Sequence, residues 1–567
     1  MNDLQRRGVG GVRIVLFGNT LDSPGRREIL HMQAVTAFYP CPHCLYTAQP
    51  GVRKQTFGGY RRFLPMNSPW RQREFVFNGQ RYMFRDVEQR PPPTLRTDQN
   101  VATMVSLARR TRPFCGHKGL PFLSAWIGAD WAGHVCDAMH DGKNFIERFL
   151  CCVVGPGAQG MYKEWAQKNR DSQHREDCRK YGIFHEVHDG ATRLPWRLTK
   201  LELKVLDKLV RSIWWPHYVE RVCDKTHSFW NKPKLMWKAK HKSYILMVLL
   251  PTLLEGYITA VHTALLHIVN ALRHLDGQVY SVSEARVHDV EPGSRVIEKG
   301  VIPYWRQVLI LGLVLLEGSF PVATLNPAMH HFCHYGGQTK QLGILGWLAM
   351  WSFERNNKFI KGMVRNRRYT LASLAKNVEM NIATRFVAFA KKGAELLSPP
   401  TLCQLSKRSV SHGIYLLSRR EKIDLALLGV TAFDDVCAFE IARVMGVHFR
   451  AGEWGRPRCG SVITTIFDRR SRYCYVKKFL KVQGQFFARV EWLSVPTYPY
   501  APDNRLVVRV RKLADAQQRQ HRCFVPLEDI DPCTVAVIPQ RDGVHFSMLR
   551  DKGYDRVDID YIYRIYS

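Results

Sequence analysis

The sequence has no apolar run long enough to cross a bilayer. The longest runs, SYILMVLLPTLL (243–254) and VLILGLVLL (308–316), stop at Glu255 and Glu317, well short of the roughly 20 residues that a transmembrane helix needs. The first residues, MNDLQRRGVGG, contain no charged segment followed by an apolar one, so no secretory signal is visible. We expect both runs to be buried helices, and we expect no membrane partner.

Regular cysteine spacing is also missing. The 15 cysteines are an odd number scattered along the chain, which argues against the disulfide framework of a small secreted protein and favours a reducing compartment. No internal repeat or low-complexity tract is evident, which argues against a repeat architecture. With 46% apolar residues among 567, the chain is long enough for roughly two to four globular domains.

Acidic residues are scarce relative to basic ones. The chain has 49 Asp and Glu against 83 Lys and Arg, a formal net charge of +34, and basic runs such as RRTRP (109–113) and RNRR (365–368) occur in every third of it. A charge this large favours a polyanionic partner, most economically nucleic acid. For any single run, a solvated surface remains the alternative.

The hydrophobic period divides the chain into three parts. GVRIVLFG (11–18) is typical of a buried strand. From residues 98 to 400 apolar residues recur at helical spacing, and from residue 435 the period changes to two, as in a small β-barrel or sandwich. The basic and aromatic stretch 57–84 predicts little regular structure beyond a hairpin. The pattern therefore indicates an N-terminal part that contains a buried strand, a mainly α middle part and an all-β C-terminal domain.

Two pairs of residues have the spacing of metal ligands. Cys41 and Cys44 form a C-x-x-C pair, and His330 and His334 lie four residues apart, which on a helix projects both imidazoles from one face. Tetrahedral zinc takes four such ligands, so the pairs predict a structural Cys2His2 site that closes a very long loop. The alternatives are an accidental pairing or the use of a neighbouring residue, either His331 or Cys333.

Several motifs, in this order, resemble the transposases of CACTA-type (En/Spm and Plavaka) DNA transposons. The apolar strand is followed by D-x-P-x-R-x-E-x-L, CPHC and FGGYRRFLPMNSPWR, and later by VCDAMHDGKNFIERFL (135–150) and WSFERNNKFIKGMVRNRR (351–368). They resemble the family's CPxC and G-[HY]-RRFLP segment, its L-D-x-M-H-x-x-KN motif and its PFER helix. Together they cover roughly residues 11–370.

The resemblance implies the fold class α/β plus a mainly α insertion plus an all-β C-terminal domain: a partial RNase H-like core that a large helical insertion interrupts, followed by a small β-barrel. The family's acidic DDE triad holds two divalent ions, Mg or Mn, which stabilise the attacking and leaving oxygens at phosphorus. By position, Asp22 matches the second Asp and Glu354 matches the Glu, although Asp22 taken alone is typical of a turn or helix cap. The resemblance also implies DNA partners (transposon ends and target), a homo-oligomer, a nuclear location, and zinc beside the active site on Cys41, Cys44, His330 and His334.

One residue of the family's triad has no counterpart. The family's first catalytic Asp lies on a strand well upstream of the second, but only 21 residues precede Asp22, and Asp3 among them is beside no strand. We expect the sequence as given to lack the first strands of the core and one third of the triad, which would severely impair two-metal catalysis. The alternative function is a non-catalytic DNA- or chromatin-binding protein derived from a transposase. A simple zinc-binding structural protein would leave the charge unexplained.

Further candidate residues lie in the motifs. Asp137 and His140 match the family's D-x-x-H motif and sit one helical turn apart, where they either share a polar site or form a helix cap with a packed histidine. Interleaved basic and aromatic residues suit phosphate contact and base stacking, with a surface loop as the alternative. The expected DNA contacts are Arg61, Arg62, Trp70, Arg71, Arg365, Arg367 and Arg368.

These features set the expected domain boundaries. The C-terminal β segment resembles the SH3- and BAH-type barrels of chromatin proteins, so we expect it to contact chromatin, with a plain structural domain as the alternative. The expected domains are 1–60 with the partial core strand and C-x-x-C, 61–97 as a basic and aromatic linker, 98–325 as the helical insertion, 326–400 with the His pair and catalytic-Glu helix, 401–434 as a linker, and 435–567 as the small β-barrel.

Overall fold

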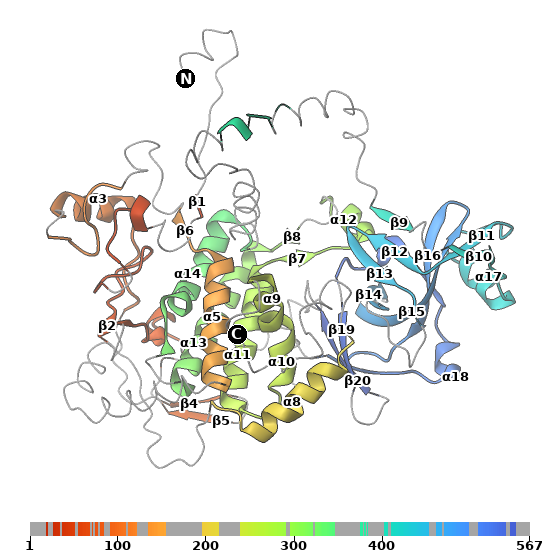
Figure 1. Cartoon of the computed structure of the whole chain (residues 1–567), viewed down its shortest axis with the longest axis horizontal. Coiled ribbons are helices and arrows are strands. Elements are labelled where there is room, and N and C mark those ends of the chain that lie inside the picture. The colour runs from red at the N-terminus through yellow and green to blue at the C-terminus, as the bar shows by residue number, and fades with distance from the viewer. Residues whose placement is uncertain are drawn as a thin grey trace, which may run out of the picture. The chain divides into compact units, whose positions relative to one another are not determined.

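The fold was analysed in a computed structural model, in which the chain divides into two compact units (Figure 1). Each unit is discontinuous in sequence: the first contains Met1–Arg148, Gly155–Leu194 and Ile302–Met350, and the second Phe149–Val154, Pro195–Val301 and Trp351–Ser567. The structure describes residues 19–20, 27–34, 37–50, 55–68, 71, 74–77, 80–83, 91–108, 112–121, 134–154, 196–214, 239–290, 295–320, 324–345, 375–377, 379–380, 383, 402–405, 410–452, 461–467, 470–497, 508–533, 535–539 and 545–550.

The first unit combines short strands with long buried helices. Its described elements are β1 (Asn19–Thr20), β2 (Gln49–Pro50), β3 (Gln55–Thr56), η1 (Tyr60–Phe63), β4 (Glu74–Phe77), β5 (Gln80–Met83), α3 (Asp98–Leu107), β6 (His134–Val135), the start of α5 (Ala138–Val154), α13 (Ile302–Ser319) and α14 (Pro327–Leu342).

Helix α13 carries one of the two long apolar runs and lies in the core of the first unit, packed against α14 and η1. Leu309, Leu313 and Leu316 are fully buried, which confirms a buried helix for this run. The helical stretch Lys299–Ser319 extends beyond the run and has the length and hydropathy of a membrane span, but 72% of its apolar 18-residue window is buried inside the structure. A core helix packed on all sides meets the same criteria.

The strands that the structure describes in the first unit form three small pairs. β1 pairs with β6 in parallel, with Thr20 opposite Val135, whereas β2 with β3 and β4 with β5 are antiparallel. The β4–β5 pair is the hairpin expected in the basic and aromatic stretch. A parallel pair requires a long crossover connection, and here that connection contains the C-x-x-C segment.

The second unit has a helical part built around α11 (Thr259–Leu275), which is buried along most of its length. The apolar run at 243–254 is also helical and buried, as expected. The other described elements of this part are α8 (Lys200–Ser212), α9 (Ala239–Tyr244), the π-helix η4 (Ile245–Leu249), α10 (Leu250–Leu253), β7 (Gln278–Val279), α12 (Val282–Val287), β8 (Arg295–Val296) and η5 (Lys299–Val301).

The remainder of the second unit is mainly antiparallel sheet. One sheet has the order β10-β11-β15-β16-β18 with β14 also on β15, a second β13-β12-β9, and a third β17-β20-β19. The elements are β9 (Cys403–Leu405), β10 (Val410–Ile414), α17 (Arg419–Ala426), β11 (Val436–Phe439), β12 (Ile441–Val444), β13 (Val447–Arg450), β14 (Val462–Phe467), β15 (Arg470–Val482), β16 (Gln485–Trp492), β17 (Val508–Arg511), α18 (Asp515–Gln518), β18 (Phe524–Pro526), η8 (Leu527–Asp529), β19 (Val535–Pro539) and β20 (His545–Arg550).

These sheets enclose an apolar core. Phe449, Phe479, Trp492, Val525 and their neighbours form one buried cluster, and the period-two pattern at the C-terminus is confirmed as antiparallel strands. Among the strands that the structure describes, the sheets do not close into a barrel. Alternation determines which side chains face the core, but it does not determine which edges pair, so the sequence pattern could not distinguish open from closed sheets.

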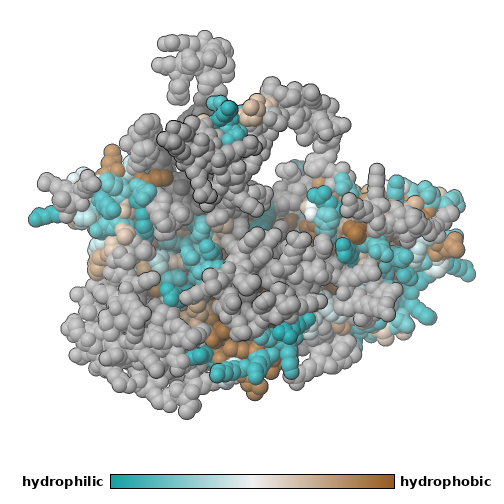
Figure 2. All heavy atoms as spheres, viewed as in Figure 1, coloured by the Kyte–Doolittle hydropathy of each residue, from teal (hydrophilic) through white to brown (hydrophobic). Residues whose placement is uncertain are grey.

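The surface near α17 mixes charge with apolar side chains. Arg419 and Lys422 are exposed there, as are Leu416 (86%), Ile423 (55%) and Leu427 (78%). In Figure 2, hydrophilic residues predominate at the end of the molecule where Figure 1 labels α17, β10 and β11, with hydrophobic atoms between them. Single exposed apolar residues are common on protein surfaces, so they assign no function here.

Candidate metal centre

The C-x-x-C loop is fixed by hydrogen bonds from two buried arginines. Arg96 Nε donates to Cys41 O at 2.9 Å, and its backbone N–H donates to His43 O at 2.9 Å. Arg27 donates from one guanidinium nitrogen to Gln33 O at 2.7 Å and from the other to Pro40 O. Because the two arginine side chains bond the carbonyls of Pro40 and Cys41, and the Arg96 backbone N–H bonds that of His43, they hold the loop in one conformation.

His117 completes this support. Its Nε2 lies 3.0 Å from Arg96 Nη1. Burial, and secondarily the charge of Arg96, lowers the pKa of His117 to about 3. The ring is therefore neutral near pH 7, and its Nε2 can accept a hydrogen bond from the guanidinium.

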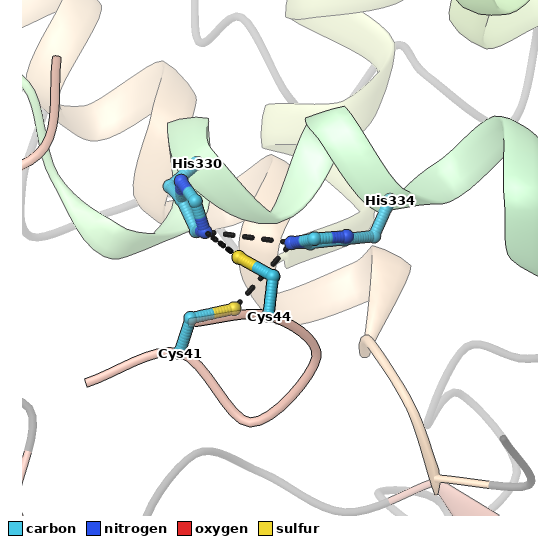
Figure 3. A group of neighbouring side chains, drawn as sticks. All are labelled: Cys41, Cys44, His330 and His334. Atoms are coloured by element: carbon cyan, nitrogen blue, oxygen red, sulfur yellow. Dashed lines mark hydrogen bonds between the residues drawn. The ribbon is translucent and has the colours of Figure 1, made fainter. Parts of the chain in front are cut away.

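Helix α14 supplies the histidine pair. Asn326 caps the helix by accepting the Met329 N–H at 3.0 Å, and Pro327 occupies the first helical turn, a combination that favours a helix start here. His330 is completely buried and His334 is 7% exposed. Four residues apart on one helix, the two imidazoles project toward the C-x-x-C loop (Figure 3).

The four predicted ligands meet. The Cys41 Sγ lies 3.4 Å from His334 Nε2, the Cys44 Sγ 3.5 Å from His330 Nε2, and the two Nε2 atoms 3.4 Å apart (Figure 3). With Zn–S bonds of about 2.3 Å and Zn–N bonds of about 2.05 Å, a tetrahedron places S and N about 3.5 Å apart and two N about 3.35 Å apart. The donor atoms thus have the spacing of a tetrahedral metal site, and this buried cluster can hold a metal ion such as zinc.

Of the neighbouring alternatives, neither replaces a ligand. The described group consists of the two predicted pairs, and His331 belongs to a separate cluster. Burial raises the pKa of Cys333 well above its usual range, so this thiol is held neutral in its apolar surroundings. The i, i+4 spacing of His330 and His334 therefore identifies the correct pair.

The electrostatics of the cluster suit a cation. Burial opposes ionisation of Cys41, but the hydrogen bond from Cys44 and the nearby His330 and His334 outweigh it, so the pKa of Cys41 lies well below its usual value. Burial and the neighbouring Cys41 raise the pKa of Cys44. Burial also lowers the pKa of His330, which keeps its ring neutral, the state that binds a metal. A bound divalent ion would favour the second thiolate as well.

Aromatic side chains cover the cluster. The ring centroid of His330 lies 4.4 Å from that of Tyr46, 5.4 Å from Phe63 and 6.0 Å from Phe57, and His334 lies 5.9 Å from Phe63. Phe57 and Phe63 both belong to the FGGYRRFLP motif. An apolar shell that excludes water strengthens metal–ligand bonds by lowering the local dielectric constant. The FGGYRRFLP motif therefore shields the metal centre from water.

Glu317 anchors that cover to α13. Its carboxylate accepts the Gly59 N–H at 2.5 Å and the Tyr60 N–H at 3.0 Å, at the start of η1, and the side chain is 4% exposed. Gly59 has φ = 75°, a left-handed conformation that favours glycine. A carboxylate on free N–H groups at a helix start is a strong, charge-assisted contact.

The variant Glu317→Gln tests this anchor. The amide keeps the shape of the side chain but turns one acceptor into a donor opposite a backbone N–H, so we expect the first unit to lose about 1–3 kcal/mol of stability. Denaturant unfolding of the full chain measures the change. Glu28→Gln, at an exposed position of the same unit, is the matched control and should stay within about 0.5 kcal/mol of wild type; an equal loss in both variants would contradict the anchor.

Asp137 and His140 lie together at the start of α5. Asp137 Oδ1 accepts the Met139 N–H at 3.1 Å and thereby caps the helix, while Oδ2 contacts His140 Nδ1. Asp137 is buried and His140 half-buried. The contact expected from one helical turn is present, and the same carboxylate also performs the capping role that the alternative assigned to it.

The other predicted site residues are divided between described and undescribed parts. Arg61 and Arg71 are buried and Arg62 is half-buried. Arg71 donates to Leu64 O at 3.0 Å and to Arg62 O at 2.7 Å, so its guanidinium holds the backbone of the motif. The candidates that lie outside the described residues are Asp22, Trp70, Glu354, Arg365, Arg367 and Arg368.

Sequence reasoning missed two features of this region. Glu317 is the acid that ends the apolar run of α13, and a charge next to a buried run is a signal of a specific buried partner. Asp141 lies 3.0 Å from His331 Nδ1 and accepts a hydrogen bond from Tyr335 at 3.1 Å. Because these residues are far apart in sequence, spacing alone gave no sign of their contact.

Comparisons of the chain with family models, with curated proteins and with solved structures found no match.

Proposed function

We propose that this chain is a transposase-related DNA-binding protein of the CACTA type, with a structural zinc ion at Cys41, Cys44, His330 and His334. The observation that carries the proposal is the meeting of the C-x-x-C pair with the histidine pair, whose contacts join residues 293 and 286 positions apart. The motif resemblance implies the same contact. A chance arrangement of two such distant pairs would rarely have tetrahedral spacing.

Zinc would act here as a structural brace. Four protein ligands fill a tetrahedral shell and leave no position for water or substrate, which distinguishes structural from catalytic zinc. The ligands come from the loop after β1 and from α14, so the ion would fix the parts of the first unit that flank the helical insertion. The resemblance implies that such a zinc site lies beside the active site, where it would fix the carboxylates of Asp22 and Glu354.

DNA is the partner that best fits the charge. A net charge of +34 would attract a polyanion over long range and give salt-dependent affinity. Transposon ends and target DNA are the expected substrates, the nucleus the expected location and a homo-oligomer the expected active form. The C-terminal sheets are a candidate contact for chromatin.

For catalysis, the proposal assigns Asp22 and Glu354 as ligands of Mg or Mn in an RNase H-like core. The parallel β1–β6 pair is compatible with such a core, because an RNase H-like sheet contains parallel strands. The other described strand pairs are antiparallel. In sequence, Asp22 follows β1 by two positions and Asp137 follows β6 by two. Two-metal chemistry would stabilise the attacking and leaving oxygens of a phosphodiester.

Glu354→Gln separates cleavage from binding. If the chain cuts DNA, nicking of a supercoiled plasmid in Mg²⁺ or Mn²⁺ should fall at least about 100-fold in this variant, because an amide is a poor ligand for a hard ion. DNA affinity, measured by a gel-shift assay, should not change, and Glu28→Gln should behave as wild type. Retained cleavage in Glu354→Gln would show that another carboxylate acts.

A wild-type chain that binds DNA without nicking it would favour the alternative, a non-catalytic DNA- or chromatin-binding protein derived from a transposase. A chain that neither binds nor nicks DNA would contradict both forms of the proposal. Zinc content alone would then support only a structural metal protein.

A further inference from the structure

We propose that Cys136, Asp141 and His331 form a second metal site, which binds Zn(II) or a similar transition-metal ion. Their ligand atoms all lie within 4.8 Å of one another and all three side chains are buried. Cys136 follows β6, Asp141 lies in the first turns of α5, and His331 lies on α14. The site is distinct from the Cys2His2 cluster and does not depend on the proposed DNA function.

The contacts of the cluster are specific. His331 Nδ1 lies 3.0 Å from Asp141 Oδ1 and 3.1 Å from Oδ2, and Tyr335 OH donates to Oδ2 at 3.1 Å. The Cys136 Sγ lies 4.0 Å from His331 O and 3.7 Å from Gln338 Nε2. A distance near 3 Å between His331 and Asp141 is compatible with a hydrogen bond and also with two ligands of one metal ion. The charge of the surrounding groups decides between these two interpretations.

The charge balance favours a cation. Asp141 is 6% exposed, and within the described part of the chain its side chain contacts no Lys or Arg, only Tyr335 and His331, which carries a positive charge only when it is protonated. The α5 N-terminus offsets only part of its charge. A buried carboxylate without a full positive charge nearby is costly. A divalent ion would supply that charge.

The ligand types indicate which ion would bind. A thiolate, an imidazole and a carboxylate together suit Zn(II) and similar transition ions, whereas Mg and Ca prefer oxygen ligands alone. Three protein ligands leave a fourth position, which a water molecule or the Tyr335 hydroxyl could fill. We therefore expect a three-ligand site rather than a closed one.

Helix α14 would supply histidine ligands to both metal centres, from two adjacent rows of side chains along the helix. His330 and His334 form one i, i+4 row, and His331, Tyr335 and Gln338 form the next. Gln338 connects the two, because its Oε1 accepts the Cys136 N–H at 3.1 Å and its Nε2 lies 3.3 Å from His43 Nδ1. The second ion would thus lie beside the first on the same helix.

Metal content of the full chain tests the proposal. The wild-type protein, expressed with zinc and freed of loosely bound metal, should contain about two zinc ions per chain. His331→Ala and Cys136→Ser should each retain about one, and Cys41→Ser should lose the other one. Cys333→Ser, a buried cysteine of α14 outside both clusters, is the matched control and should retain two. Asp141→Asn, which keeps the hydrogen-bonding shape, should also retain only one.

The outcomes separate the two sites. One zinc ion in the wild type, lost in Cys41→Ser and kept in His331→Ala, would overturn the second site and leave the first intact. Two zinc ions in both the wild type and the folded His331→Ala and Asp141→Asn variants would equally overturn it. A cobalt-substituted His331→Ala chain should keep the thiolate charge-transfer band of the Cys2His2 site, and loss of that band would overturn the separation of the two sites.

Discussion

Cys41→Ser should release about one zinc ion per chain and destabilise the first unit strongly. If zinc is present at roughly 1,000 times its dissociation constant, loss of the ion removes about 4 kcal/mol, which for a unit of this size lowers the melting temperature by roughly 10 °C. The loss of stability is large because the four ligands come from segments that are distant in the sequence. The free energy of zinc binding therefore contributes directly to holding these segments together in the folded state. Metal analysis and thermal unfolding measure the two effects.

Cys115→Ser is the matched control for this variant. Cys115 belongs to the same unit and is half-buried, but it is no part of either ligand group that the structure describes. It should keep its zinc and unfold within a few degrees of wild type. Wild-type zinc content and stability in Cys41→Ser would contradict the site, and so would an equal loss in Cys115→Ser.

DNA affinity should fall about 10³- to 10⁵-fold between 50 and 200 mM salt if the chain neutralises roughly 6–10 phosphates. The physical reason is counterion release: every phosphate that a Lys or Arg neutralises frees an ion, and added salt opposes that release. Fluorescence anisotropy with a labelled duplex over a salt series gives the slope of log K against log salt. A slope near zero would contradict a phosphate-binding surface.

The triple variant Arg365→Gln, Arg367→Gln and Arg368→Gln locates part of that surface. The magnitude of the slope should fall by about 1 for each phosphate contact removed. A matched pair of neutralisations, Arg419→Gln with Lys422→Gln at exposed positions of the second unit, should change the slope less. Arg71→Ala is a poor probe, because Arg71 bonds the backbone carbonyls of Arg62 and Leu64 and its loss would disturb the fold.

The metal centre could be predicted from the sequence because its chemistry is local. The C-x-x-C turn places two ligands on one short loop, and the i, i+4 spacing places the two histidines on one face of a helix. The sequence also indicates where that helix begins, because Asn326 is a favourable N-cap and Pro327 suits the first helical turn. The spacing of the two pairs predicts that Cys41, Cys44, His330 and His334 meet, the resemblance implies the same site, and the positions of the four residues in the structure agree with both. The buried helices and the C-terminal antiparallel strands followed from hydrophobic period alone.

Features that depend on distant packing could not be predicted. The Glu317 contact with Gly59 and Tyr60 joins residues more than 250 positions apart, and Asp141 with His331 spans 190. Arg61 and Arg71 are buried, although basic residues in a polar motif are typical of an exposed surface. The alternation of apolar and polar residues along the C-terminal strands likewise did not determine which strand edges pair. In each case the missing information is which segments lie against each other.

The most direct test of the proposed zinc brace is the zinc K-edge absorption spectrum of the His331→Ala chain, in which the Cys2His2 site alone should hold metal. The proposal predicts about two sulfur neighbours near 2.3 Å and about two nitrogen neighbours near 2.0–2.1 Å. A zinc shell of nitrogen and oxygen without sulfur, or a folded chain that binds no zinc, would contradict it.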